Sequence, residues 1–156
     1  GIRWTHPESW HVTLRFIGDM EESSLPLLSK ALSGNLQTHR SGIVKVRGIG
    51  FFGREARPKV LWAGVGGTDW LRHLQTSVQK GIEVLGRPDD LRVYNPHLTL
   101  ARIKKAPLSH PLLAEMESRY SYEWGEVQVL RVVLYKSVTT NKGPVYSVLK
   151  TFPLDD

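Results

Sequence analysis

The sequence of 156 residues contains no cysteine, and this absence excludes disulfide frameworks and cysteine-ligated metal sites. It also has no apolar run near the ~20 residues that a membrane-spanning helix needs, and residues 1–10 lack the apolar core of a signal peptide. We therefore expect a protein without a membrane partner. A lack of cysteine agrees with a reducing compartment, so the cytoplasm is the default location.

Low-complexity tracts and linker-like segments are absent too, and the hydrophobic fraction of 40% is that of an ordinary globular protein. We predict one domain over residues 1–156, and a monomer. Positive charge is in excess, with 21 Lys and Arg against 15 Asp and Glu. This excess favours a polyanionic partner such as a nucleic acid, although charge alone does not identify one.

Apolar periodicity predicts a mixed succession of strands and helices. The predicted elements are a strand over 10–17, a helix from Ser23 or Ser24 to 34–35, strands over 43–52 and 59–66, a helix over 69–85, a strand over 97–103, a helix starting at 109–111, and strands over 127–138 and 145–150. This order is typical of an α+β fold with mostly antiparallel sheet. Because strand, helix and strand pair recur, we expect two similar halves related by a pseudo-twofold axis.

The pattern His-apolar-Thr-apolar occurs twice, in "WHVTLRF" at 10–16 and in "PHLTLAR" at 96–102. Residues i and i+2 of a strand point to the same face, so each histidine shares a face with its threonine while the apolar partners face the core. The side chains of His11, Thr13, His97 and Thr99 are therefore free to line a cleft between the halves. A phosphate group is the natural target. Either motif alone is better explained as the polar face of a half-exposed strand, and it is the repetition that favours a shared site.

Two imidazoles that titrate near neutral pH can divide acid–base work, one accepting a proton and the other delivering one, without a metal ion. The threonine hydroxyls can donate hydrogen bonds to phosphoryl oxygens, and β-branching keeps them stiff at χ1. The other histidines are interpreted as surface residues because none has a partner at metal-ligand spacing. They are His6, His39, His73 and His110.

Four segments resemble, in the same order, the two-histidine phosphoesterases and among them the RNA 2′,3′-cyclic phosphodiesterases, also called 2′-5′ RNA ligases. They are "WHVTLRFIG" at 10–18, "VLWAGV" at 60–65, "NPHLTLAR" at 95–102 and "GPVYSVL" at 143–149. The resemblance implies a bilobal fold with two antiparallel sheets and a central cleft. It also implies hydrolysis of an RNA terminal 2′,3′-cyclic phosphate to a 2′-phosphate, without a metal or other cofactor.

Carried onto this sequence, the resemblance makes His11 the general acid and His97 the general base, although the two roles are open to exchange. It assigns Phe16 to stacking on the terminal base and Arg102 to gripping phosphate. Strict alternation would turn both away from the histidine face, so the strands must bend or end before them. Their alternative roles are a core phenylalanine and a surface arginine.

Basic residues flank two of the predicted strands and form a possible rim that guides an RNA chain, or simply solvated surface. They are Arg54, Arg57, Lys59, Lys104 and Lys105. Trp62 and Tyr146 are candidates for lining the cleft, with core packing as the favoured role.

Members of the family begin with a further strand and helix before the first motif, and we expect this segment to be absent here or to lie outside the sequence. Two other functions are weighed beside hydrolysis. One is a non-catalytic RNA- or nucleotide-binding module, and the other is 2′-5′ ligation of tRNA halves at the same site.

Overall fold

The computed structural model describes residues 1–54, 56–66, 69–87, 92–105 and 108–156. The chain divides into two compact units, each assembled from three separate segments. Unit 1 consists of Gly1–Leu14, Ile43–Thr68 and Arg92–Val127, and unit 2 consists of Arg15–Gly42, Asp69–Leu91 and Gln128–Asp156. The units are therefore interleaved along the sequence rather than being its two consecutive halves.

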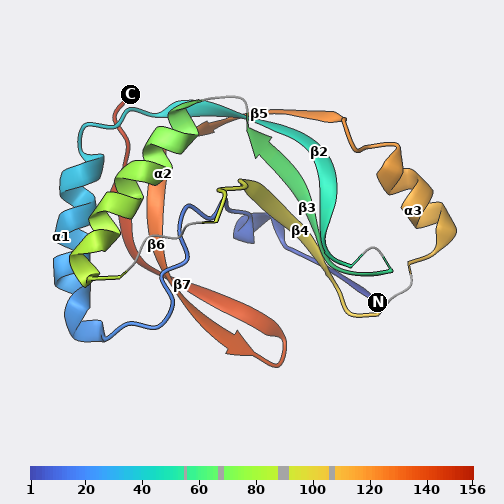
Figure 1. The fold of residues 1–156 in the computed structure, drawn as a ribbon, viewed down its shortest axis with the longest axis horizontal. Coiled ribbons are helices and arrows are strands. Elements are labelled where there is room, and N and C mark those ends of the chain that lie inside the picture. The colour runs from blue at the N-terminus through green and yellow to red at the C-terminus, as the bar shows by residue number, and fades with distance from the viewer. Residues whose placement is uncertain (55, 67–68, 88–91, 106–107) are drawn as a thin grey trace. The chain divides into compact units, whose positions relative to one another are not determined.

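Unit 1 is built on a sheet whose described strands follow the order β1-β4-β3-β2-β5 (Figure 1). Their bounds are β1 (Ile2–Trp4), β2 (Gly42–Arg54), β3 (Arg57–Gly66), β4 (His97–Ile103) and β5 (Glu123–Val129). The pairs β1–β4, β3–β4 and β2–β3 are antiparallel. The predicted hairpin of strands over 43–52 and 59–66 is confirmed, as is the strand over 97–103 with the same bounds.

One face of this sheet carries the core of unit 1. Ile49, Leu61, Ala101 and Met116 form a buried cluster, and Leu112 packs against it. Met116 and Leu112 belong to α3 (His110–Glu117), which begins, as predicted, after Ser109 with Pro111 in its first turn. The core therefore occupies the face of the sheet that α3 covers and leaves the other face for polar residues.

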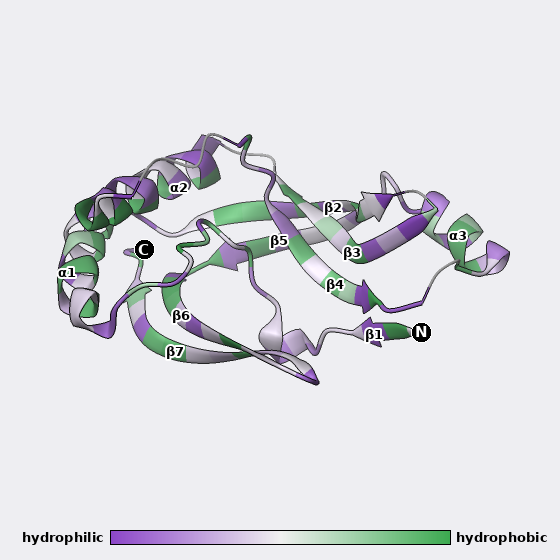
Figure 2. Cartoon of the chain, turned by 60° about the horizontal axis from the view of Figure 1, so that its bottom comes forward, coloured by the Kyte–Doolittle hydropathy of each residue, from purple (hydrophilic) through white to green (hydrophobic). Residues whose placement is uncertain are grey.

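Unit 2 combines a helix pair with a two-stranded antiparallel sheet. The helices are α1 (Leu25–Leu36) and α2 (Asp69–Ile82), and the strands are β6 (Arg131–Thr140) and β7 (Gly143–Pro153). Hydrophilic and hydrophobic residues alternate along α2 (Figure 2), and its apolar residues are buried while its charged ones are exposed. A short helical turn, η3 (Glu83–Leu85), follows α2 and ends, as predicted, at Gly86 with φ of 67°.

The fold agrees with the α+β class and the antiparallel sheets expected from the sequence. Two predicted elements are wrong in detail. The first helix continues through Gly34 and Asn35 to Leu36, because a helix-breaking pair at an exposed position does not outweigh the burial of Leu36. The predicted strand over 127–138 is two strands, since β5 ends at Val129 and β6 starts at Arg131 in a different sheet. Alternation of polar and apolar residues indicates an extended backbone, but it does not indicate which strand that backbone pairs with.

The predicted strand over 10–17 is also wrong. In that stretch only Val12 forms a bridge, to Leu98, and the chain passes into unit 2 after Leu14. The edge of β4 is paired mainly by β1, which is too short to give a periodic signal, and a 3₁₀ turn, η1 (Pro7–Ser9), separates β1 from the first motif.

Along the described ranges, no helix has both the length and the apolarity to cross a bilayer.

Candidate active site

Both His-x-Thr motifs lie in unit 1, and a bridge between their central residues joins them. Val12 pairs with Leu98 in antiparallel fashion. In the register centred on this pair, His11 is opposite Thr99 and Thr13 is opposite His97. Opposed residues of an antiparallel pair point to the same face of the sheet. This register predicts that the four polar side chains share one face, which we call the site face, and that the two apolar residues point to the other.

The neighbouring strands continue this arrangement in rows across the sheet. On β3, Trp62 is opposite Thr99 and Gly64 is opposite His97. On β2, Gly50 is opposite Trp62 and Arg47 is opposite Gly64. The intervening Leu61 and Ala63 are buried on the core face. The site face thus carries histidine, threonine, tryptophan and arginine side chains with glycines between them.

A β-bulge brings Arg102 onto the site face. The β3–β4 register passes from Trp62↔Thr99 to Leu61↔Ala101, so Leu100 has no partner on β3. After this extra residue, Arg102 pairs with Val60, which shares the face of Trp62. Five positions after His97, regular alternation would have placed Arg102 on the opposite face. The structure therefore contains the irregularity that a phosphate-binding role for Arg102 requires.

The two histidines have the same hydrogen-bonding geometry. His11 Nδ1 lies 2.8 Å from the carbonyl oxygen of Ser9, and His97 Nδ1 lies 2.7 Å from that of Asn95. A carbonyl oxygen only accepts, so Nδ1 carries the hydrogen in each ring. In a neutral ring, Nε2 is then the basic nitrogen, and in a charged ring it is an acid. Each imidazole is thereby prepared for proton transfer at Nε2.

Two aromatic residues surround His97. The ring of Phe52 meets the imidazole edge to face, with centroids 4.8 Å apart, and the Trp62 ring lies 6.2 Å away. Trp62 packs over Gly50, where an added Cβ would lie 2.3 Å from the indole. Trp62 is half-buried on the site face, so the core role favoured from the sequence is wrong. Phe52 had no sequence signal, because its face becomes known only from the pairing of β2 with β3.

Tyr94 links the two motifs and was also missed by the sequence analysis. Its hydroxyl donates to the carbonyl oxygen of Thr13 over 3.0 Å. Burial raises the pKa of Tyr94 to about 12, so this donor stays protonated at neutral pH. Tyr94 lies outside both motifs in an irregular segment, and a single tyrosine there has no recognisable pattern.

The predicted rim residues are all exposed and belong to unit 1. Arg54 and Arg57 pair at the end of the β2–β3 hairpin, whose residue 55 lies outside the described residues. Lys59 follows at the start of β3, and Lys104 and Lys105 follow the end of β4. In an antiparallel sheet these positions share one end, which is the end that carries Arg102.

Three other residues weighed from the sequence belong to unit 2. Phe16 belongs to unit 2 and is 70% exposed, and its stacking role stays a prediction. Tyr146 packs against Tyr135 within unit 2. His39 is half-buried and bonded to the Ser77 hydroxyl over 2.6 Å, so its interpretation as a surface residue is wrong.

Among the described residues, no three His, Asp or Glu side chains cluster as metal ligands.

Comparison with known proteins assigns the family. The chain belongs to the 2′-5′ RNA ligase superfamily, whose model matches residues 6–141. A protein of Aeropyrum pernix named RNA 2′,3′-cyclic phosphodiesterase is 35% identical over 149 residues, which cover 95% of this chain and 84% of that protein. A protein of the same name from Archaeoglobus fulgidus is 33% identical, with coverage of 97% and 84%.

Solved structures agree with this assignment. A Thermus thermophilus protein superposes with a TM-score of 0.79 at 29% identity, covering 99% of this chain and 82% of that one. The Escherichia coli protein LigT, in complex with 3′-AMP, gives a TM-score of 0.74 at 22% identity, with the same coverage. The second likeness extends to the fold alone.

Proposed function

We propose that this protein hydrolyses the 2′,3′-cyclic phosphate at the end of an RNA chain. The observation that carries the proposal is the single face of the unit 1 sheet on which both His-Thr pairs and Arg102 lie. The relatives named RNA 2′,3′-cyclic phosphodiesterase support the substrate class. The formal charge of +6 favours association with a polyanion.

In the proposed reaction, water attacks the phosphorus atom and the bond from phosphorus to O3′ breaks, which leaves a 2′-phosphate and a 3′-hydroxyl. Nε2 of neutral His97 takes a proton from the water, and Nε2 of charged His11 gives a proton to O3′. One proton is taken and one is given, so the next turnover needs only proton exchange with solvent. Because both Nδ1 atoms donate to carbonyl oxygens in the same way, the two roles can be exchanged.

Charge on the phosphoryl oxygens is stabilised, in this proposal, by hydrogen-bond donors of the chain itself. The bridge register pairs Thr13 with His97 and Thr99 with His11, which supports threonine hydroxyls as donors, and the Arg102 guanidinium can bind two oxygens at once. No step requires a metal ion.

An RNA substrate also agrees with the predicted cytoplasmic location. Sedimentation of the purified protein tests the predicted monomer.

The test is a product assay with a short RNA that ends in a 2′,3′-cyclic phosphate. We expect hydrolysis to a 2′-phosphate, unchanged by EDTA, with a bell-shaped dependence of kcat/KM on pH. Loss of turnover on chelation contradicts the metal-free mechanism, and a 3′-phosphate product contradicts the direction of bond cleavage.

The same assay separates the alternative functions. A protein that binds the RNA end without turnover is a binding module rather than an enzyme. Ligation is the reverse of transesterification at the same phosphorus, and the family description includes it. Supplying a second RNA with a free 5′-hydroxyl, such as a tRNA half, would show ligation as a longer product joined through a 2′-5′ bond.

A further inference from the structure

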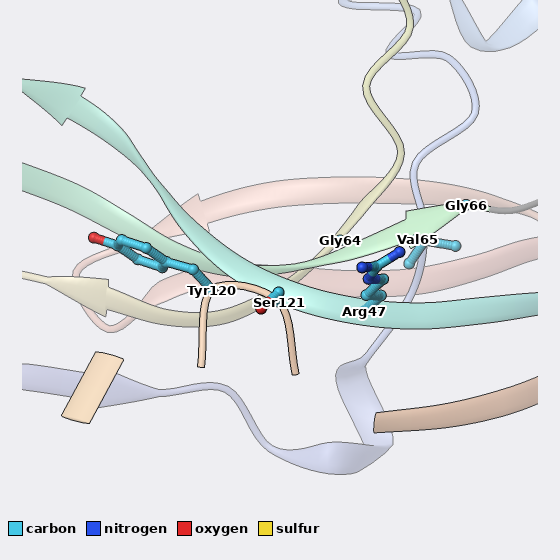
Figure 3. A pocket seen from close by; sticks show the side chains of 6 residues that line it. All are labelled: Arg47, Gly64, Val65, Gly66, Tyr120 and Ser121. Carbon is cyan, nitrogen blue, oxygen red and sulfur yellow. The ribbon is translucent and has the colours of Figure 1, made fainter. Parts of the chain in front are cut away.

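An open pocket of about 370 Å³ lies on unit 1, in a place to which the proposed reaction assigns no role (Figure 3). It is lined by Arg47, Gly64, Val65, Gly66, Tyr120 and Ser121. The Arg47 side chain rises from β2 toward β3, and the turn that carries Ser121 closes the edge of the pocket. The lining of the pocket therefore includes one cationic side chain, Arg47, one hydroxyl, that of Ser121, and the stretch of β3 from Gly64 to Gly66.

The strand pairing connects this pocket to the second motif. Arg47 is opposite Gly64, and Gly64 is opposite His97, so the three residues form one row on the site face. Two strand spacings separate the Cα atoms of Arg47 and His97 by about 9.5 Å. Because a glycine stands between them, the row itself has no side chain between Arg47 and the proposed catalytic histidine, and the Trp62 indole lies beside the row, 3.8 Å from the place of a Cβ at Gly64. An extended ligand can run along this row.

Two glycines of β3 line the pocket and differ in the space around them. Gly64 is required by close packing, whereas Gly66 has room for a side chain. A Cβ at Gly64 would lie 2.6 Å from the carbonyl oxygen of Arg47, so no larger residue fits without a shift of backbone. A Cβ at Gly66 would meet none of the described residues within 4 Å. The pocket floor is thus bare, and Lys45 opposite Gly66 adds a second cation beside it.

The Arg47 guanidinium is exposed, and within the described ranges it makes no ion pair or hydrogen bond. An arginine fork presents parallel N–H groups that match two oxygens of a phosphate. Ser121, also exposed, adds a hydroxyl donor on the other side of the pocket. This donor set suits a phosphodiester better than a neutral ligand.

We propose that Arg47, with Ser121 and the glycine floor, binds the phosphodiester that precedes the terminal nucleotide of the RNA. The proposal rests on the proposed function, because it takes the cyclic phosphate to lie at His97. It makes the protein selective for RNA chains over mononucleotides, since only a chain carries a second phosphate at this distance.

The experiment compares two substrates in wild type and Arg47→Ala: a nucleoside 2′,3′-cyclic phosphate and a trinucleotide with the same end. For the trinucleotide we expect KM to rise about tenfold. The slope of log KM against log salt concentration should also fall by about 0.7. For the mononucleotide, kcat and KM should stay within about twofold of wild type. Arg72→Ala, which removes an exposed arginine of α2, is the control for net charge.

A second variant adds repulsion without removing Arg47. Gly66→Asp introduces a carboxylate at a position with room for a Cβ among the described residues. It should raise KM for the trinucleotide and leave KM for the mononucleotide near wild type, as Arg47→Ala should. The subsite proposal would be overturned if kcat/KM fell equally for both substrates, or if the trinucleotide KM were unchanged in Arg47→Ala. Equal losses in Arg72→Ala would assign the effect to overall charge and overturn it too.

A binding measurement separates failure of the subsite from failure of the proposed function. If wild type hydrolyses neither substrate, fluorescence titration with a 3′-phosphorylated trinucleotide and with a nucleoside 3′-phosphate still tests Arg47. Selective weakening of the trinucleotide in Arg47→Ala supports the subsite even then. Equal affinities of wild type and variant for both ligands would refute it.

Discussion

The two His-x-Thr motifs have the same residue pattern but are held in place by different means. The second motif is part of β4, which has β3 along one edge and β1 along the other. The first motif has a bridge from Val12 to β4, a contact of His11 with Ser9 in its own segment, and a hydrogen bond from the hydroxyl of Tyr94, which precedes β4. Ladder hydrogen bonds support His97, whereas His11 lies outside the named strands, next to an isolated bridge.

This difference shows that chemical equivalence at a site does not require equivalent secondary structure. Both imidazoles donate from Nδ1 to a carbonyl two residues earlier, although only one of them is in a strand. The local i−2 contact sets the tautomer, and the surrounding sheet sets how firmly the ring is held. Substitutions that remove the rings should therefore have similar effects, and substitutions that loosen the supports should not.

The largest effect is expected from removal of either imidazole. His11→Ala and His97→Ala should each lower kcat at least ~100-fold, because each removes one proton-transfer group. Both are partly exposed, so melting temperatures should change little. His73→Ala, on the exposed side of α2, is the matched control.

Sulfur in place of the bridging O3′ tells the two imidazoles apart. A sulfur leaving group needs little protonation, so this substrate should restore activity to the variant that lacks the acid and not to the one that lacks the base. Rescue of His11→Ala alone assigns the roles as proposed. An unchanged rate for either alanine variant would remove that histidine from the mechanism.

Arg102→Ala should have the next largest effect, a fall in kcat/KM on the order of tenfold to a hundredfold, because a charged donor to the phosphate is lost. The control is Arg3→Ala, since Arg3 is directly opposite Arg102 on β1 and is exposed too. Steady-state kinetics on the cyclic mononucleotide is the measurement. If both variants lose activity equally, Arg102 acts only through the local charge of the sheet.

The sequence was sufficient to predict the strand of the second motif and the face that His97 and Thr99 share, because residues two apart on a strand point to the same side. It also required an irregularity before Arg102, and the bulge at Leu100 provides it. The position of that bulge was not predictable, since nothing in "HLTLARI" marks which residue loses its partner. Pairing between strands decides this, and pairing is a property of the whole sheet.

The supports of the first motif were not predictable for a related reason. "WHVTLRF" alternates as a strand does, yet the edge of β4 is largely taken by Ile2–Trp4, so the motif makes one bridge instead of a ladder. Alternation records which residues can face the core and not whether an edge is vacant. Phe52 and Arg47 became candidates only once the strand register gave their face of the sheet, and Tyr94 only through its hydrogen bond to Thr13.

A smaller effect is expected from Tyr94→Phe, which removes the hydroxyl bonded to Thr13 and keeps the ring. Loss of this hydrogen bond should destabilise the protein by about 1 kcal/mol. Because this hydrogen bond ties the first motif to the segment that precedes β4, kcat should fall several-fold while KM stays near wild type. Tyr122→Phe is the control, and equal kcat values for Tyr94→Phe and wild type would show that the bridge at Val12 suffices.

The smallest effect is a dependence of stability on alkaline pH. The pKa of Tyr94 is raised to about 12 by burial, above the value of 10.0 for an unhindered tyrosine, so the folded state holds this proton more tightly than the unfolded state. The stabilisation is complete below pH 10 and is lost as the pH rises through 12. Wild type should therefore lose more stability than Tyr94→Phe between pH 9 and pH 11.5, measured by urea unfolding. Parallel losses in the two proteins would mean that the Tyr94 hydroxyl ionises as freely in the folded chain as in the unfolded one, and that its bond to Thr13 does not hold the first motif.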